Sequence, residues 1–179
     1  YYEGTTNNKW IEITNPGPGP VNLGSGGWTL TLWTGANAEG YKTGGTADQT
    51  MDLTALGNLG AGGVSLVSRP TSVNPTYASA DLTNTQTINF SGDDSVVLYH
   101  SGAIVDAIGF TAANEGVNTS FVRTLALPGW DTTAGSNATD FPSVWTEFTI
   151  AAVDGATSGA EEYLGTSTVP VELQAFTIE

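Results

Sequence analysis

The stretch from Tyr1 to Ile13 reads YYEGTTNNKWIEI, and the stretch from Ile88 to Gly109 reads INFSGDDSVVLYHSGAIVDAIG. In both stretches apolar and polar residues alternate, and Gly, Asn and Asp interrupt the alternation. This pattern is typical of half-buried strands joined by tight turns. The two stretches together predict a β-sandwich.

The strand predicted from Lys9 to Thr14 has two distinct faces. Ile11 and Ile13 share one face, and Trp10 and Glu12 share the other, because successive side chains of a strand point to opposite sides. The run Asn-Pro-Gly-Pro-Gly-Pro at residues 15–20 then predicts an abrupt end of this strand.

A second strand is predicted at residues 28–34, where Leu30 and Leu32 lie on one face and Trp33 lies on the other. Ser95–His100 and Ala103–Phe110 predict a hairpin, because Ser101-Gly102 separates two runs rich in Val and Ile. Other strands are predicted at residues 50–53, 64–68, 87–90, 121–127 and 144–150.

Helical periodicity is weak throughout the chain, and Thr54–Leu59 is too short to form a stable helix alone. No internal repeat is visible, which argues against a propeller. The predicted fold class is therefore all-β: an Ig-like antiparallel β-sandwich with long loops and a C-terminal strand-like tail. We expect the sandwich to occupy residues 1–168, and residues 169–179 to form a tail, a linker or an assembly strand.

The charge of the chain limits its partners. Eighteen acidic residues stand against four basic ones, which gives a net charge of −14. Nucleic acid is not an expected partner, because affinity for it rests mainly on Lys and Arg neutralising phosphates. No apolar run is long enough to span a bilayer.

Other compositional features predict an exported protein. The chain has no cysteine and little lysine, and it is rich in Thr, Gly, Asn and Ser. We interpret it as a mature or excised segment of a bacterial protein that is secreted or at the cell surface, since it does not begin with Met. Candidate glycosylation sequons occur at Asn89, Asn118 and Asn137.

Several phrases resemble bacterial lamin-tail domains. The phrase YEGTTNNKWIEITNP at residues 2–16 is similar to the opening of that family, and NFSGDDSVVL at residues 89–98 is similar to its hairpin. Weaker similarities are VDAIG at 105–109, TSFVRT at 119–124 and EYLGT at 162–166. The resemblance implies a non-catalytic Ig-like module of secreted or surface proteins, some of which accompany extracellular nucleases and phosphatases.

The tail resembles a different feature of exported proteins. Residues 169–179 read VPVELQAFTIE and are similar to the PVEL-type junction that precedes C-terminal sorting or anchoring regions. In this tail Val171 and Leu173 alternate with polar residues, and the phase changes before Phe176 and Ile178. We expect these four apolar residues to serve assembly.

The sequence offers no catalytic set. His100 is the only histidine, and no G-x-S-x-G elbow presents a nucleophile to it. With one His and no Cys, the chain lacks the usual ligands of a zinc site. Asp93-Asp94 and Glu161-Glu162 are adjacent carboxylates in predicted turns, so neither forms an acid/base pair across a substrate. We expect no enzyme activity.

Two kinds of binding site are nevertheless candidates. Calcium is the only expected cofactor, and the ligands favoured for it are Glu3, Glu12, Asp93 and Asp94, although no D-x-D-x-D-G loop is present. Trp10 and Trp33 lie out of phase with the apolar residues of their strands. We therefore expect them to be exposed for contacts with a glycan or a protein.

Two hypotheses of function follow from these observations. The first is a structural or adhesive surface module that acts through protein contacts, including contacts with copies of itself by strand complementation. The alternative is an accessory domain of a larger secreted enzyme that holds glycan or surface ligands near the catalyst.

Overall fold

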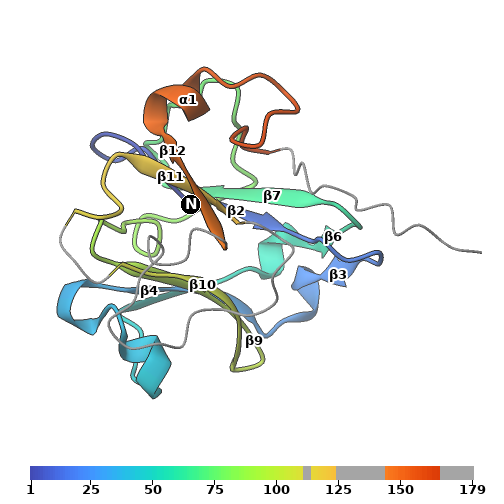
Figure 1. Cartoon of the computed structure of the whole chain (residues 1–179). Coiled ribbons are helices and arrows are strands. Elements are labelled where there is room, and N and C mark those ends of the chain that lie inside the picture. The colour runs from blue at the N-terminus through green and yellow to red at the C-terminus, as the bar shows by residue number, and fades with distance from the viewer. Residues whose placement is uncertain (111–113, 124–143, 166–179) are drawn as a thin grey trace, which may run out of the picture.

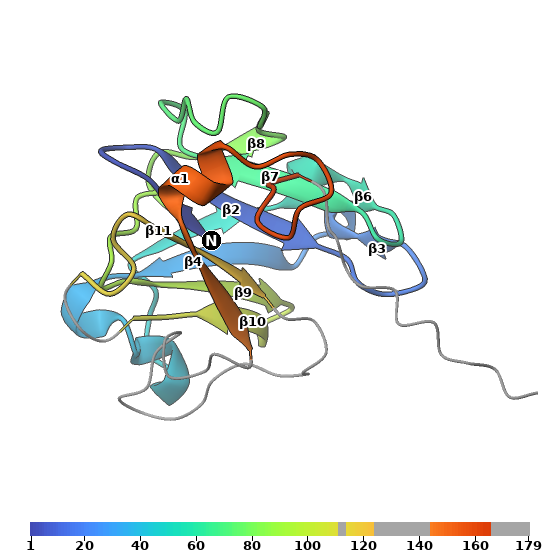
Figure 2. The same cartoon turned by 45° about the horizontal axis from the view of Figure 1, so that its top comes forward.

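The computed structural model describes residues 1–110, 114–123 and 144–165, and in these residues two sheets of mostly antiparallel strands pack face to face. Figure 1 shows the two layers, with β2 and β7 in the upper one and β4, β9 and β10 in the lower one. Figure 2 shows that the C-terminal part of the described chain lies across the outside of the upper layer. The predicted all-β sandwich class is confirmed.

The larger sheet has six strands in the order β12-β11-β1-β2-β7-β8. All neighbours in it are antiparallel except β7 and β8, which are parallel. Its strands are β1 (Tyr2–Glu3), β2 (Lys9–Thr14), β7 (Val64–Ser68), β8 (Leu82–Thr83), β11 (Thr119–Arg123) and β12 (Trp145–Thr149).

The smaller sheet has four strands in the order β10-β9-β4-β5. They are β4 (Trp28–Trp33), β5 (Gln49–Asp52), β9 (Ser95–His100) and β10 (Ala103–Ile108), and a bulge interrupts the register of β10. A two-stranded sheet, β3 (Val21–Asn22) and β6 (Asn58–Leu59), lies at one end. The helices are four 3-10 turns, η1 (Leu23–Ser25), η2 (Gly35–Asn37), η3 (Gly40–Thr43) and η4 (Thr54–Leu56), and α1 (Ile150–Asp154).

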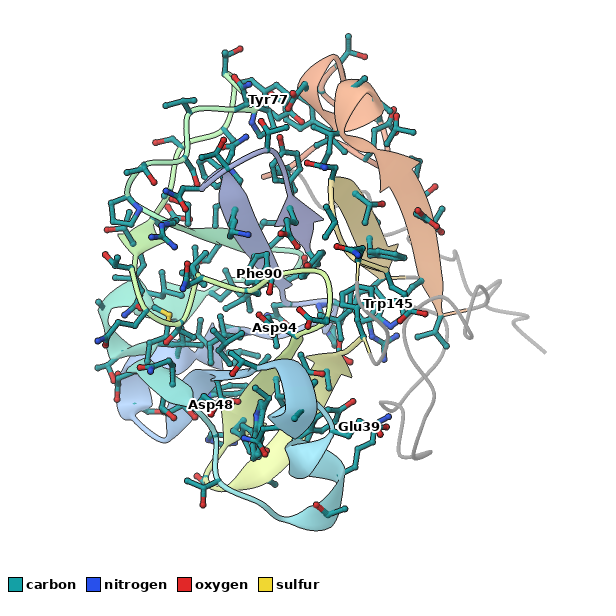
Figure 3. All side chains as sticks on the ribbon, turned by 90° about the vertical axis from the view of Figure 1, so that its left-hand side faces the viewer. Glu39, Asp48, Tyr77, Phe90, Asp94 and Trp145 are labelled. Carbon is teal, nitrogen blue, oxygen red and sulfur yellow. The ribbon has the colours of Figure 1, made fainter. Side chains whose placement is uncertain are left out.

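The main core fills the space between the two sheets. It contains Ile11 and Ile13 from β2, Leu30 and Leu32 from β4, and the buried ring of Phe90, as the alternation of the strands predicts. Phe90 lies at mid-height of the molecule, near Asp94 (Figure 3). Four aromatic rings meet in this core, since Tyr1 contacts Phe90, Phe110 and Phe121.

Both sheets are also covered on their outer faces. On the larger sheet, residues of α1 and of the segments 77–80 and 163–164 pack over Trp10 and Leu66. On the smaller sheet, Trp33 and Tyr41 form a separate cluster with apolar residues of β9 and β10. The described residues therefore form one central core between the two sheets and one smaller core on the outer face of each sheet.

Asn15 explains why β2 ends where it does. Its side-chain nitrogen donates hydrogen bonds to the carbonyl oxygens of Gly19, Leu59 and Gly60, and its oxygen accepts one from the Gly17 N–H. The buried amide thus holds the proline-rich loop against residues 59–60, while the Asn15 backbone still pairs with Gly62 and Gly63.

Some predicted strand boundaries are wrong. Residues 87–90 form no strand, because the Asn84 side chain accepts hydrogen bonds from the N–H groups of Gln86 and Thr87 and holds a turn there. The strand predicted at 121–127 begins earlier, at Thr119, and its second half lies outside the described residues. The predicted strand 144–150 ends at Thr149, where α1 begins.

In the described part of the chain, no helix is long and apolar enough to cross a membrane. The predicted assembly residues Val171, Leu173, Phe176 and Ile178 lie outside the described residues, as does the sequon at Asn137.

Candidate functional site

Glu3, the first predicted calcium ligand, is held by donors of the protein itself. Its Oε1 lies 2.8 Å from the Nζ of Lys9, and its Oε2 accepts a hydrogen bond of 2.7 Å from the Tyr1 hydroxyl. Lys9 Nζ also donates to the Phe90 carbonyl and lies over the Phe90 ring. Both charged side chains are buried, so this ion pair belongs to the interior of the sandwich.

Asp93 and Asp94 lie in the predicted turn after Phe90. Asp94 is buried and accepts hydrogen bonds from the N–H groups of Ser91 and Gly35, and Asp93 accepts one from the Ser91 hydroxyl. Burial raises the pKa of Asp94, and these hydrogen bonds oppose the rise. The turn chemistry therefore accounts for both carboxylates.

Glu12, the remaining predicted ligand, lies on the outer face of β2. Its Oε2 accepts a hydrogen bond of 2.6 Å from the Gly165 N–H, and its Oε1 accepts one from the Thr14 hydroxyl. Burial raises the pKa of Glu12 above its usual value of 4.5. Glu12 thus ties the C-terminal segment to the sheet.

The four predicted calcium ligands do not converge. In the residues that the structure describes, no three His, Asp or Glu side chains form a group that could hold a metal ion. Glu3 lies between the sheets and Glu12 lies on the outer face. Calcium binding by these residues stays a prediction without geometric support.

Glu12 makes stability depend on pH in a defined direction. Because its pKa is raised in the folded chain, the folded state keeps this proton to higher pH than the unfolded state. The stabilisation by the neutral form is complete below pH 4.5 and is lost as the pH rises through the folded pKa. We expect Glu12→Gln to weaken the decline in unfolding free energy above pH 4.5, measured by urea denaturation.

The comparison with the unmodified chain isolates Glu12 from the other acids. Burial also raises the pKa of Asp106, whereas hydrogen bonds lower the pKa of Asp48 and Asp52, and these residues are the same in both proteins. If the free energy of unfolding changed with pH in the same way for Glu12→Gln and for the unmodified chain, the pKa of Glu12 would be the same in the folded and unfolded states.

The predicted exposure of Trp10 and Trp33 is wrong. Each is only 3% exposed. The Trp10 indole N–H donates to the Asn74 carbonyl at 2.6 Å, and its side chain belongs to a buried cluster with residues of α1 and Leu164. These covering elements are distant in sequence, so the alternation of β2 could not reveal them.

Trp33 is buried beneath the turn η3. Its indole N–H donates to the Thr31 hydroxyl at 2.9 Å, and its ring meets Tyr41 edge-on. A Cβ atom at Gly40 would lie 2.8 Å from the Trp33 ring, which explains why glycine stands where η3 crosses the tryptophan. Neither tryptophan offers a face to a glycan.

His100 lies at the end of β9, as predicted, and its ring stacks on Trp28 with centroids 4.3 Å apart. This stacking gives the residue a structural position. Two of the candidate sequon asparagines are exposed: Asn89, which accepts a hydrogen bond from Arg69, and Asn118. Their modification stays a prediction.

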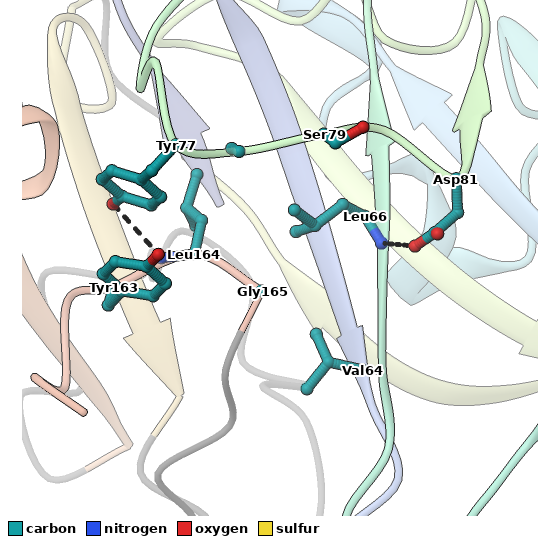
Figure 4. A pocket seen from close by; sticks show the side chains of 9 residues that line it. Val64, Leu66, Tyr77, Ser79, Asp81, Tyr163, Leu164 and Gly165 are labelled. Atoms are coloured by element: carbon teal, nitrogen blue, oxygen red, sulfur yellow. Dashed lines mark hydrogen bonds between the residues drawn. The ribbon is translucent and has the colours of Figure 1, made fainter. Parts of the chain in front are cut away.

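A cleft of about 300 Å³ lies on the outer face of the larger sheet and was not predicted from the sequence. Three segments far apart in sequence line it: β7 with Leu66, the connection with Tyr77 and Asp81, and the C-terminal segment with Tyr163 and Gly165. Figure 4 shows the two tyrosines on one side of the cleft and Asp81 on the other. The phrase EYLGT was noted only as a resemblance and carried no signal of a cleft.

Contacts with the backbone fix the walls of this cleft. The rings of Tyr77 and Tyr163 stack in parallel with centroids 4.0 Å apart. The Tyr77 hydroxyl donates to the Val153 carbonyl and accepts from the Leu164 N–H. The Asp81 Oδ2 accepts from the Leu66 N–H at 2.8 Å (Figure 4). Burial raises the pKa of Tyr77, and the charges of Asp154 and Glu12 raise it further.

Comparison with known proteins identifies the family. A family model described as Lamin Tail Domain matches residues 1–112, which include both motifs that open the sequence analysis. The search of curated proteins gave no match. The chain belongs to the lamin tail domain family, whose members are non-catalytic Ig-like domains that often mediate protein–protein contacts.

Proposed function

We propose that this chain is a non-catalytic module of a bacterial protein that is secreted or at the cell surface, where it acts through protein–protein contacts. Membership of the lamin tail domain family supports action by contact. A composition rich in Thr, Gly, Asn and Ser and poor in lysine, together with a tail that resembles a PVEL-type junction, supports export.

The contact that we propose is strand complementation between copies of the chain. The donor is the tail at residues 169–179, where Val171, Leu173, Phe176 and Ile178 supply the apolar side chains. The acceptor is the edge of the larger sheet at β12. An extended segment that joins a sheet edge gains affinity from main-chain hydrogen bonds.

The register of β12 is the observation that carries this proposal. All five residues of β12 pair with β11 without a shift, and in the described part of the chain β12 pairs on one side only. The other edges are poorer templates. β8 has two residues, β5 has four, and a bulge interrupts β10. Short and bulged edges are devices that prevent edge-to-edge pairing.

Light scattering over a wide concentration range tests this function. We expect the mass of the full chain to rise with concentration and that of a chain lacking residues 169–179 to stay that of a monomer. Leu173→Asp should abolish the rise, and Gln174→Asp should preserve it. The two variants carry the same charge change, but only Leu173 is one of the four apolar residues that the proposal uses. A full chain that stays monomeric throughout would contradict the proposal.

The alternative function is an accessory domain of a secreted enzyme that holds a glycan. The burial of Trp10 and Trp33 removes the two residues on which this alternative depended. A glycan array probed with the full chain tests it, and binding there together with monomeric behaviour would favour it over self-assembly.

A further inference from the structure

The basic residues of the chain leave the acidic ones in excess at the surface. Lys9 pairs with Glu3, Lys42 with Glu39 and Arg123 with Asp106, and Arg69 donates to the Asn89 side chain. These four are all the Lys and Arg of a chain that carries eighteen acids. The potential around the molecule is therefore negative, and it favours cationic ligands.

The cleft at Tyr77 and Tyr163 has an excess of acidic over basic residues. Asp81 is exposed and lines it, and Glu12 accepts a hydrogen bond from Gly165 at its margin. No Lys, Arg or His of the described residues lines the cleft. The negative charges of Asp154 and Glu12 also act on the Tyr77 phenol.

Three polar groups of the cleft have no hydrogen-bond partner among the residues that the structure describes. They are the Oδ1 of Asp81, the hydroxyl of Ser79 and the hydroxyl of Tyr163. Each can accept a hydrogen bond, and one of them carries a full negative charge. The partners of the neighbouring groups, Asp81 Oδ2 and the Tyr77 hydroxyl, are backbone groups that fix the cleft in this shape.

The geometry points to an arginine-binding cleft: we propose that it receives the side chain of an arginine on a partner protein. This inference rests on the proposed function, since it names a chemistry for one protein contact. A guanidinium is planar, presents five N–H donors and is weakly hydrated, which suits a site with one carboxylate, two hydroxyls and two aromatic rings. A lysine ammonium would match the charge but not the spread of acceptors.

The C-terminal segment of the described chain supplies one wall of the cleft. Tyr163, Leu164 and Gly165 form one wall, and they lie outside the part of the chain that the family model matches, which ends at residue 112. Gly165 has a φ of +91°, a conformation that side chains rarely adopt, and its N–H is held by Glu12. The C-terminal segment thus supplies one wall of the cleft and is tied to β2 through Glu12.

NMR titration of the ¹⁵N-labelled full chain with N-acetyl-arginine amide tests the proposal. At low salt we expect shifts at residues that line the cleft and a dissociation constant on the order of 1 mM, as for one side chain in a shallow site. N-acetyl-citrulline amide has the same shape without the charge and should bind at least tenfold more weakly. N-acetyl-lysine amide should bind several-fold more weakly.

Two variants locate the site. Asp81→Asn keeps an oxygen for the Leu66 N–H and should weaken arginine binding at least fivefold, and Tyr163→Phe should weaken it about twofold. Asp52→Asn makes the same charge change on β5 of the other sheet, and it should leave binding unchanged. Equal effects of Asp81→Asn and Asp52→Asn, equal binding of citrulline or lysine, or shifts remote from the cleft would each overturn the proposal.

The result of the arginine titration can be told apart from the result of the self-assembly test. The titration uses a single amino acid derivative, so it does not require the tail or a second copy. Arginine binding by a chain that stays monomeric would support the cleft and contradict self-assembly. Self-assembly without arginine binding would contradict the cleft alone.

Discussion

Replacing Lys9 by methionine is expected to lower the free energy of unfolding by about 3–5 kcal/mol, because it leaves the Glu3 carboxylate charged and unpaired in the interior. Lys9 Nζ lies 2.8 Å from Glu3, and both side chains are 7% exposed. Methionine retains most of the apolar stem, so the loss reports the missing charge rather than a cavity. Urea denaturation at pH 7 measures the effect.

The double variant Lys9→Met, Glu3→Gln is the control for this prediction. With both charges removed, no buried ion remains uncompensated, and we expect the double variant to be more stable than Lys9→Met alone. A Lys9→Met chain as stable as the unmodified one would mean that water reaches Glu3 and that the pair is not interior.

Replacing Trp10 by alanine is expected to destabilise the chain by about 3–5 kcal/mol, the usual cost of removing a large buried aromatic side chain. Trp10 is 3% exposed, and its loss opens a cavity between β2 and α1 and removes the hydrogen bond to the Asn74 carbonyl. Thermal or urea denaturation measures the effect.

Val73→Ala is the matched control for Trp10→Ala. Val73 precedes Asn74 but is 73% exposed, so we expect a change within about 0.5 kcal/mol. A Trp10→Ala chain of unchanged stability would place Trp10 on an open surface and would revive its predicted role in glycan binding.

Most of the predicted strands are found close to their predicted positions. The strands β2, β4 and the β9–β10 hairpin lie close to where alternation places them, and the strands predicted at 64–68 and 50–53 are found as β7 and β5. Residues 87–90 show why this signal can mislead. Ile88 and Phe90 alternate and are fully buried, but the turn held by Asn84 places them in the core without a ladder.

The tryptophans show a second limit. Alternation correctly places Trp10 and Trp33 on the faces opposite the central core, yet it carries no information about what covers those faces. The helix α1 that covers Trp10 follows its N-cap Thr149, whose hydroxyl accepts from the Ala152 N–H, and the sequence predicts no helix after the strand at 144–150. Outer-face burial is a tertiary property and was not predictable from local pattern.

The cleft and the predicted calcium ligands also depend on tertiary structure, which local sequence pattern does not reveal. The predicted ligand set joined residues that the fold places on different faces, between the sheets for Glu3 and outside them for Glu12. The cleft joins Leu66, Tyr77 and Tyr163 from three distant segments, and no spacing in the sequence connects them. The family match covers residues 1–112 and therefore also leaves out one wall of the cleft.

Amide hydrogen exchange tests most directly whether β12 accepts the tail of another copy of the chain. A chain lacking residues 169–179 is measured with and without a synthetic peptide of sequence VPVELQAFTIE. We expect the peptide to slow exchange at amides of β12, residues 145–149, and to leave the edge strand β5 unchanged. Unaltered exchange at β12 with saturating peptide, or protection confined to another edge, would contradict the account.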